Sequence, residues 1–264
     1  MPTTAIDARS VQLHIGSATH EAVVGSNLLA TIGKRVAPLV RGPRCAIIAD
    51  SNTSALYSAY VRRSLERAGF ESVVITIPVG ENSKSLEQAA VVCEQMAAAG
   101  LDRTSFVVAL GGGVVGDLGG FAAAIYHRGI PHVQIPTTLL AQVDSSIGGK
   151  TAVNTPTGKN LLGAVHQPVL VIADVDTLKT LPPRELNQGF AEIVKHAVIA
   201  DPSLFDLLRD FDARNFADLV RHNIEIKARI VARDEHDSSG ERAILNFGHT
   251  VGHAIERAGG YGRF

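Results

Sequence analysis

The chain has 264 residues, of which 45% are hydrophobic, and its 25 basic and 26 acidic side chains leave a formal net charge of −1. This balance lacks the basic excess of proteins that bind nucleic acid or a membrane surface, and 5% aromatic residues without tryptophan disfavour a base-stacking platform. Cys45 and Cys93 are too few for a disulfide framework, so we expect reduced thiols. No apolar run could span a membrane and the first residues lack a signal-peptide pattern, so we expect a cytoplasmic location.

Short β-rich runs alternate with longer helical segments through the first two thirds of the sequence. Strands are predicted at residues 11–15, 21–24, 45–50, 72–79, 105–113, 132–138 and 169–174, and the first two are candidates for a hairpin. Helices are predicted at residues 28–40, 55–69, 84–100 and 117–129. This rhythm predicts a mostly parallel, Rossmann-like α/β sheet with helices on both faces.

From about Thr177 the pattern becomes helical. Helices are predicted at residues 182–200, 202–211, 213–235 and 241–259, and prolines mark several of their starts. No strand is predicted after Asp174. We therefore predict an α/β domain over residues 1–176 and an all-helical domain over residues 177–264.

A glycine-rich stretch follows a predicted strand and enters a helix. It contains Gly111, Gly112, Gly113, Gly116, Gly119 and Gly120. Glycine lets the backbone approach a pyrophosphate, and a helix N-terminus offers N–H donors and a positive dipole. The order differs from the usual dinucleotide-binding fingerprint, so a tight strand-to-helix turn remains the alternative.

Polar side chains stand where neighbouring strands end. Asp50 ends one strand and Asn52 follows it, and an acidic group there either bonds ribose hydroxyls, favouring NAD over NADP, or caps a helix. Glu81 and Lys84 occupy the next loop, where solvated surface charges are the alternative. Because α/β sheets bind ligands at the carboxyl edge, we expect these loops to meet at one site.

The segment from residue 136 to residue 168 is rich in glycine and small polar residues. Thr137 and Thr138 offer hydroxyls suited to a ribose or a nicotinamide amide. Asp144, Lys150, Lys159 and Asn160 follow, and two lysines near an asparagine can hold a phosphate or carboxylate through charge-assisted hydrogen bonds. A polar surface hairpin is the alternative.

Two histidines near the end of the chain lie one helical turn apart. His249 and His253 can share a metal, or one can bind it while the other relays protons, although such a pair alone is a weak signal. A second helix supplies Glu192, Lys195 and His196, and a carboxylate among apolar residues needs a partner such as a metal. We take Glu192 and His249 as candidate ligands, and a catalytic site would need a third.

The chain resembles the 3-dehydroquinate synthase family in six segments: GENSKS, ALGGGVVGDLGGFAAAIYHRGI, QIPTTLLAQVDSSIGGKTAVN, GKNLLGAVHQP, GFAEIVKHA and LNFGHTVGHAIE. They follow the family's order and span nearly the whole chain. The resemblance implies a dehydroquinate synthase-like fold, with an α/β NAD-binding domain, a helical metal domain and an active site between them. It also implies a homodimer.

The reaction implied by the resemblance belongs to the shikimate pathway of aromatic amino acid biosynthesis. A phosphate lyase of this family converts 3-deoxy-D-arabino-heptulosonate 7-phosphate to 3-dehydroquinate and phosphate. NAD⁺ oxidises a hydroxyl transiently, phosphate is eliminated, the ketone is reduced again and an intramolecular aldol step closes the ring. A Zn²⁺ or Co²⁺ ion acts as the Lewis acid.

The resemblance also assigns residues. Glu192 and His249 resemble the metal ligands, and His253 resembles a histidine that handles protons. The residues that resemble the substrate pocket are Asp144, Lys150, Asn160, Lys195, Lys227, Arg242 and Asn246, and Arg128 resembles a residue that reaches the phosphate site of the other subunit. The residues that resemble NAD contacts are Asp50, Asn52, Glu81, Lys84, Gly113, Val114, Asp117, Thr137, Thr138 and Lys159. The resemblance thus moves Lys159 from an anion site to the cofactor.

The sequence departs from the family pattern at its end. In the family a further motif, LHGE, supplies the third metal ligand, which by motif would fall shortly beyond Phe264. We therefore expect a helical domain truncated at its C-terminus, weak metal binding and poor activity of the 264-residue chain alone.

Three other functions stay open. Another sugar phosphate cyclase, such as 2-deoxy-scyllo-inosose synthase, would share the cofactors but take a sugar without the carboxylate that Arg242 would bind. A metal-dependent alcohol dehydrogenase would release NADH, whereas a cyclase shows no net NADH. A regulatory protein would bind NAD without catalysis.

Overall fold

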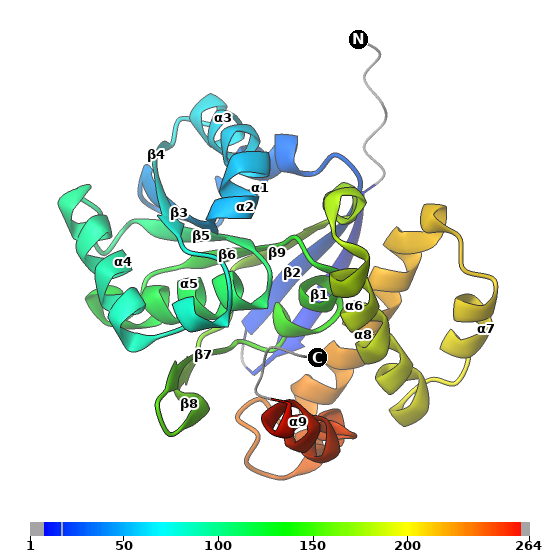
Figure 1. The fold of residues 1–264 in the computed structure, drawn as a ribbon. Coiled ribbons are helices and arrows are strands. Elements are labelled where there is room, and N and C mark those ends of the chain that lie inside the picture. The colour runs from blue at the N-terminus through cyan, green and yellow to red at the C-terminus, as the bar shows by residue number, and fades with distance from the viewer. Residues whose placement is uncertain (1–7, 17, 260–264) are drawn as a thin grey trace.

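A seven-stranded sheet forms the centre of the computed structural model, which describes residues 8–16 and 18–259 (Figure 1). The strand order is β1-β2-β9-β6-β5-β3-β4. The strands are β1 (Ala8–Ile15), β2 (Ala18–Gly25), β3 (Arg44–Asp50), β4 (Glu71–Ile77), β5 (Phe106–Gly111), β6 (His132–Pro136) and β9 (Leu170–Asp174). Neighbours from β2 to β4 are parallel, and β1 pairs antiparallel with β2 as the predicted hairpin. The prediction of a mostly parallel sheet is confirmed.

Helices cover both faces of this sheet (Figure 1). One face carries η1 (Leu29–Thr31), α1 (Ile32–Val36), α2 (Ser51–Thr53), η2 (Ser54–Ser58) and α3 (Ala59–Arg67), and the other carries α4 (Leu86–Ala98), α5 (Gly113–Ile125) and η4 (Tyr126–Arg128). Successive side chains of a strand point to opposite faces. On β3, Ile47 packs in the cluster that contains Leu65 of α3, whereas Ile48 packs in the cluster that contains Leu118 of α5. Burial on both sides explains why this strand is apolar throughout.

Several helices differ from their predicted bounds. The segment 241–259, predicted as one helix, is divided into η8 (Glu241–Asn246) and α9 (His249–Ala258), and Gly248 between them has a positive φ of 80°. The segment 28–40 forms only η1 and α1, because Pro38 has no N–H to continue the helix. α5 begins at Gly113 rather than at residue 117, and its glycines let it lie close to its neighbours. A Cβ atom on Gly119 would lie 2.9 Å from the Cβ of Ala109, and one on Gly120 would lie 2.5 Å from the Cγ2 of Thr151. Close packing is therefore one physical reason for the glycine-rich stretch.

A separate two-stranded hairpin lies below the main sheet, beside α5 (Figure 1). It consists of β7 (Lys150–Thr155) and β8 (Gly158–Val165), which pair antiparallel. The second half of the polar segment, residues 150–165, therefore forms a hairpin, as the alternative interpretation held, and residues of this hairpin also line the cavity described below.

The region after β9 is helical in the part of the chain that the structure describes, as predicted. It contains η6 (Val175–Thr180), α6 (Pro183–Ile199), α7 (Leu204–Arg209), η7 (Ala213–Asn215), α8 (Phe216–Arg233), η8 (Glu241–Asn246) and α9 (His249–Ala258). Its core continues into the sheet, because Leu13 of β1 and Ala22 of β2 share one cluster with Ile193 of α6 and Ile224 of α8. Two further turns, η3 (Glu81–Ser83) and η5 (Ala141–Ser145), follow β4 and β6. No helix among the described residues is both long and apolar enough to cross a membrane.

Candidate functional site

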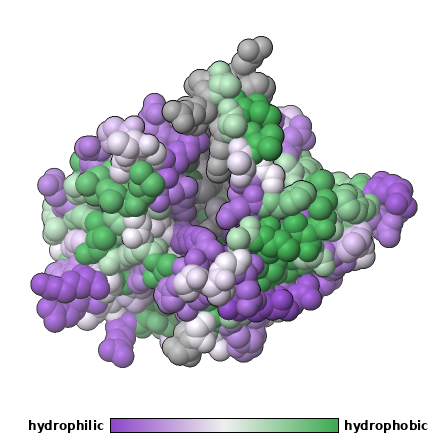
Figure 2. All heavy atoms as spheres, turned by 90° about the horizontal axis from the view of Figure 1, so that it is seen from below, coloured by the Kyte–Doolittle hydropathy of each residue, from purple (hydrophilic) through white to green (hydrophobic). Residues whose placement is uncertain are grey.

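A cavity of about 660 Å³ opens between the β7–β8 hairpin and the helices of the C-terminal part. Figure 2 shows hydrophilic side chains around a hollow on the face below the sheet. The predicted site residues that line the cavity are Asp117, Asp144, Lys150, Asn160, Lys195, Lys227, Arg242, Asn246 and His249. They come from α5, η5, both strands of the hairpin and four C-terminal elements, so the fold gathers residues that are far apart in the sequence.

A buried ion pair joins α8 to η5 at the cavity wall. The Nζ atom of Lys227 lies 2.7 Å from Oδ1 of Asp144 and also donates to the backbone oxygen of Asp144 at 2.6 Å. Burial alone would raise the pKa of Asp144, but the Lys227 and Lys195 ammonium groups outweigh it and hold this pKa at about 2. Burial lowers the pKa of Lys227, and Asp144 opposes that shift. The site therefore holds an ionised carboxylate that is largely buried, with 21% of its side chain exposed at the cavity wall.

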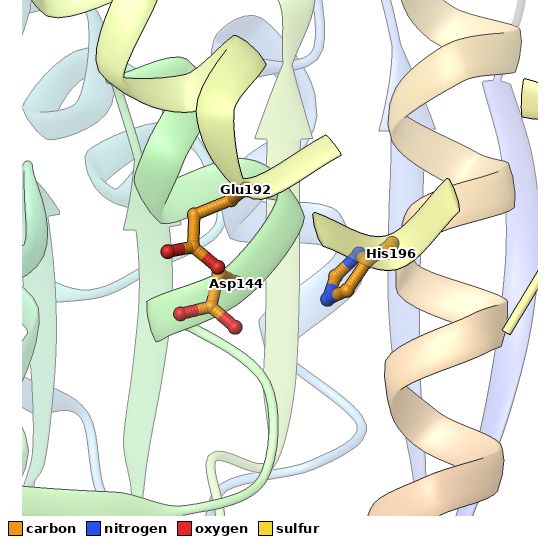
Figure 3. Close-up of side chains that lie close together, drawn as sticks. All are labelled: Asp144, Glu192 and His196. Carbon is orange, nitrogen blue, oxygen red and sulfur yellow. The ribbon is translucent and has the colours of Figure 1, made fainter. Parts of the chain in front are cut away.

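The two predicted metal ligands meet in the structure. Oε1 of Glu192 lies 3.4 Å from Nε2 of His249, and the other Glu192 oxygen pairs with Lys195 one turn along α6. Ligand atoms of Asp144, Glu192 and His196 lie within 4.8 Å of one another. Figure 3 shows the two carboxylates side by side, with the His196 ring pointing toward them. Oxygen and imidazole donors at this spacing suit Zn²⁺ or Co²⁺.

Residues predicted for the cofactor contact a residue predicted for the substrate. Lys84 is 6% exposed, and its Nζ atom lies 2.5 Å from Oδ2 of Asp117 and 2.5 Å from Oδ1 of Asn160. Burial raises the pKa of Asp117, and Lys84 acts against that shift. This cluster links the glycine-rich helix α5 to the cavity.

The lining of the cavity includes an ion pair that the sequence did not predict. Lys150 lies 2.5 Å from Oδ2 of Asp237, which belongs to the loop between α8 and η8. The carboxylate of Asp234 anchors this loop by accepting hydrogen bonds from backbone N–H groups, including that of Ser238 at 2.8 Å. The Arg242 guanidinium donates to the backbone oxygens of Gly148 and Glu235. Local sequence carries no signal for Asp237, because its partner lies in a distant hairpin.

The other predicted cofactor residues follow the carboxyl ends of parallel strands. Asp50 accepts from the N–H of Thr53 at 2.8 Å, so the helix-cap interpretation is confirmed for this carboxylate. Thr138 accepts from the N–H of Ala141, while the buried Thr137 hydroxyl has no partner among the described residues. Gly113 and Val114 open α5, Asn52 is exposed on α2, and Glu81 accepts from the side chain of Asn154 at 2.7 Å. This edge is the one predicted to bind a nucleotide.

Three further predicted residues remain to be placed, and two of them, Arg128 and Lys159, do not line the cavity. Arg128 is exposed in η4 and has a positive φ of 69°, and Lys159 is exposed on β8. The side chain of His253 lies outside the part of the chain that the structure describes. Their predicted roles therefore stay predictions.

Comparison with known proteins identifies the family. The family model for the N-terminal part of 3-dehydroquinate synthase matches residues 74–188, and the model for the C-terminal part matches residues 189–264. The chain belongs to the 3-dehydroquinate synthase family. The 3-dehydroquinate synthase of Symbiobacterium thermophilum is 51% identical over 259 residues, which are 94% of this chain and 72% of that protein. The resemblance found in the sequence motifs is thus confirmed.

Solved structures of sugar phosphate cyclases share the fold. A 2-deoxy-scyllo-inosose synthase complexed with carbaglucose-6-phosphate, NAD⁺ and Co²⁺ has a TM-score of 0.88 at 27% identity, covering 95% of this chain and 71% of that chain. The 2-epi-5-epi-valiolone synthase of Streptomyces hygroscopicus subsp. jinggangensis, with NAD⁺ and Zn²⁺ bound, has a TM-score of 0.79 at 31% identity, covering 89% and 67%. These structures confirm the predicted dehydroquinate synthase-like fold class.

Proposed function

We propose that this protein is a 3-dehydroquinate synthase. It is a carbon–oxygen lyase that converts 3-deoxy-D-arabino-heptulosonate 7-phosphate to 3-dehydroquinate and phosphate. The observation that carries the proposal is the cavity in which Lys150, Lys195, Lys227 and Arg242 converge. Four cations around one cavity suit a substrate that carries both a phosphate and a carboxylate. Membership of the family supports the same reaction.

The residues present fit the two cofactors that the sugar phosphate cyclases hold. NAD⁺ would lie along Asp50, which also caps α2, and along Glu81, the start of α5 and Thr137. When bound, it would accept a hydride from a substrate carbon that bears a hydroxyl group, leaving a ketone, and return that hydride later. Zn²⁺ or Co²⁺ would be held by Glu192 and His249, and when bound it polarises the reacting hydroxyls. The oxygen and nitrogen donor set and the unpartnered Thr137 hydroxyl support this assignment.

The charged residues of the cavity would bind and orient the substrate. Lys227 and Arg242 are 6% and 4% exposed, so an anion that reaches them leaves bulk water and gains stronger electrostatic attraction. Asp144 is an ionised acceptor at the cavity wall and would accept a hydrogen bond from a substrate hydroxyl. Holding both ends of a flexible chain in this way favours ring closure.

Further parts of the proposal come from the family resemblance. His253 would help to handle protons during the reaction, and Arg128 would reach the phosphate of the substrate in the partner subunit of a homodimer. Asn160 and Asn246 would bind substrate hydroxyls, and Lys159 would contact the cofactor. We place the enzyme in the cytoplasm.

The test is phosphate release from 3-deoxy-D-arabino-heptulosonate 7-phosphate by the purified protein with NAD⁺ and Zn²⁺ or Co²⁺. We expect phosphate without accumulation of NADH, and loss of about 100-fold or more in kcat/KM for Arg242→Met, because a buried charge-assisted contact is removed. The surface variant Arg214→Met, whose guanidinium pairs only with Asp212 among the described residues, is the control.

A panel of substrates separates the alternatives. Release of phosphate from glucose 6-phosphate alone would point to 2-deoxy-scyllo-inosose synthase activity. Net NADH from simple alcohols would point to a dehydrogenase. NAD⁺ binding without any turnover would point to a regulatory protein.

A further inference from the structure

An irregularity in the β7–β8 hairpin takes Asn154 out of the strand ladder. The register shifts between Val153 and Thr155, and no residue of β8 is paired with Asn154 between them. Such a break frees backbone groups of the strand and redirects side chains. The N–H group of Asn154 donates instead to the backbone oxygen of Lys84 at 2.8 Å, and a bridge joins Asn154 to Ser85. The break therefore attaches the hairpin to the loop that follows β4.

The side chain of Asn154 uses both ends of its amide. Its Nδ2 group donates to Oε1 of Glu81 at 2.7 Å, and its Oδ1 atom accepts the backbone N–H of Asn160 at 2.9 Å. An ionised carboxylate only accepts and a backbone N–H only donates, so the two neighbours require one donor and one acceptor at position 154. Asparagine offers both, whereas aspartate offers only acceptors and leucine offers neither.

The two residues that Asn154 holds have different roles in the proposed function. Glu81 is an exposed side chain assigned to NAD⁺, and its hydrogen bond to Asn154 selects one of its rotamers. Asn160 is assigned to the substrate and lines the cavity. Its φ of 57° is uncommon outside glycine, and its Oδ1 atom lies 2.5 Å from Nζ of Lys84. Asn154 thus fixes the backbone of Asn160, while Lys84 fixes its side chain.

We propose that Asn154 is a positioning residue of the enzyme, which orients Glu81 for the cofactor and Asn160 for the substrate. Asn154 is half-buried and does not line the cavity, so it acts through these two neighbours. Side chains that are held in place before a ligand arrives lose less conformational entropy on binding. Hydride transfer also requires that cofactor and substrate be held in a defined geometry. The inference rests on the proposed function, from which the roles of Glu81 and Asn160 are taken.

Two replacements of Asn154 separate its two hydrogen bonds. NAD⁺ affinity is measured by calorimetry, and the KM for 3-deoxy-D-arabino-heptulosonate 7-phosphate is measured by phosphate release at saturating NAD⁺. Asn154→Asp keeps the acceptor for Asn160 but places a like charge beside Glu81, so we expect about 10-fold weaker NAD⁺ binding and a KM within about 3-fold. Asn154→Leu removes both hydrogen bonds and should also raise the KM by about 10-fold. The control is the same pair of replacements at Asn215, which is exposed before α8 and makes no side-chain cap hydrogen bond.

An exchange of donor and acceptor distinguishes positioning from a general effect on the fold. In a Glu81→Gln background the new amide can donate to the carboxylate introduced by Asn154→Asp, which restores the hydrogen bond in the opposite direction. We therefore expect Asn154→Asp to weaken NAD⁺ binding by less than about 3-fold in that background, against about 10-fold beside Glu81. This exchange also decides the matter if Asn154→Leu does not fold, because aspartate and asparagine have nearly the same shape.

The outcomes for the inference and for the proposed function are distinct. If both Asn154 variants keep the NAD⁺ affinity and the KM of an active unaltered protein, the inference is wrong and the proposed function stands. An equal loss of NAD⁺ affinity in both backgrounds would also overturn the inference. If the unaltered protein binds NAD⁺ but releases no phosphate, the proposed function fails, and the NAD⁺ titrations decide the role of Asn154. If it binds no NAD⁺, the inference fails together with the assignment of Glu81.

Discussion

Replacing Lys227 by methionine tests whether the buried pair with Asp144 supports the fold as well as the site. The ion pair spans 2.7 Å, and at an effective dielectric constant of about 20 its Coulomb attraction is about 6 kcal/mol. Removing Lys227 also removes the cost of burying its ammonium group, and Lys195 still attracts the carboxylate of Asp144, so the net loss of stability is smaller than this attraction. We therefore expect the free energy of unfolding to fall by about 3 kcal/mol at neutral pH, the lower end for a broken buried pair.

Urea denaturation of the variant at pH 7 and pH 5 measures this loss. In the unaltered protein the pKa of Asp144 is depressed to about 2, so its stabilisation is complete above about pH 4 and is lost as the pH falls toward 2. Without Lys227, burial raises the pKa of Asp144. More of this carboxyl group is then protonated at pH 5, which reduces the cost of burying it unpaired. The difference in unfolding free energy between the variant and the unaltered protein should therefore be smaller at pH 5 than at pH 7. The exposed pair of Lys179 with Asp176 supplies the control, since Lys179→Met should change stability by less than about 0.5 kcal/mol. A loss below about 1 kcal/mol, or a gap that does not change with pH, would refute the reasoning.

Three further predictions concern the framework of the site. Gly189→Ala on α6 should lower the melting temperature, although alanine has the better helix propensity, because the new Cβ would lie 2.5 Å from the Cβ of Leu139. Gly252→Ala on α9 is the control and should not lower the melting temperature, because its Cβ would meet nothing within 4 Å. Asp174→Ala should cost about 2–4 kcal/mol in urea denaturation, because it orphans the backbone N–H groups of Leu28 and Leu29, and an unchanged midpoint would contradict this. Thiol titration should label the half-buried Cys93 before Cys45, whose pKa burial raises to about 12, and the reverse order would count against the packing of β3.

The sheet could be predicted because its signals are local. Successive side chains of β3 point to opposite faces of the sheet, which places Ile47 and Ile48 in different hydrophobic clusters. Glycine marks the ends of helices, as Gly100 does after α4. The helix at 28–40 was predicted too long because periodicity was weighed above Pro38. The extended hairpin β7–β8 was only an alternative, since its glycines and polar residues give no clear period.

The sequence predicts which residues belong to the site, but it does not predict which of them contact one another. The motifs marked Lys84, Asp117 and Asn160, yet no local pattern shows that one ammonium group holds the other two. The role of Asp237 follows from the approach of a distant loop to Lys150. His196 was visible beside Lys195, but the hydrogen bond at its Nδ1 atom is made with another helix and exists only in the folded chain.

The packing of α8 on the first two strands has a consequence for the order of assembly. Lys227 stands on a helix whose apolar side shares a core with Leu13 and Ala22 near the beginning of the chain. During synthesis on a ribosome the parallel strands can emerge and pair before α8 has been synthesised. Until α8 packs on them, β1 and β2 therefore expose one apolar side to solvent. Closing such a long loop is slow, and the nascent chain is exposed to aggregation until it closes. The substrate cavity would thus be among the last parts to form, and a chaperone that shields the first hairpin should raise the yield of active protein.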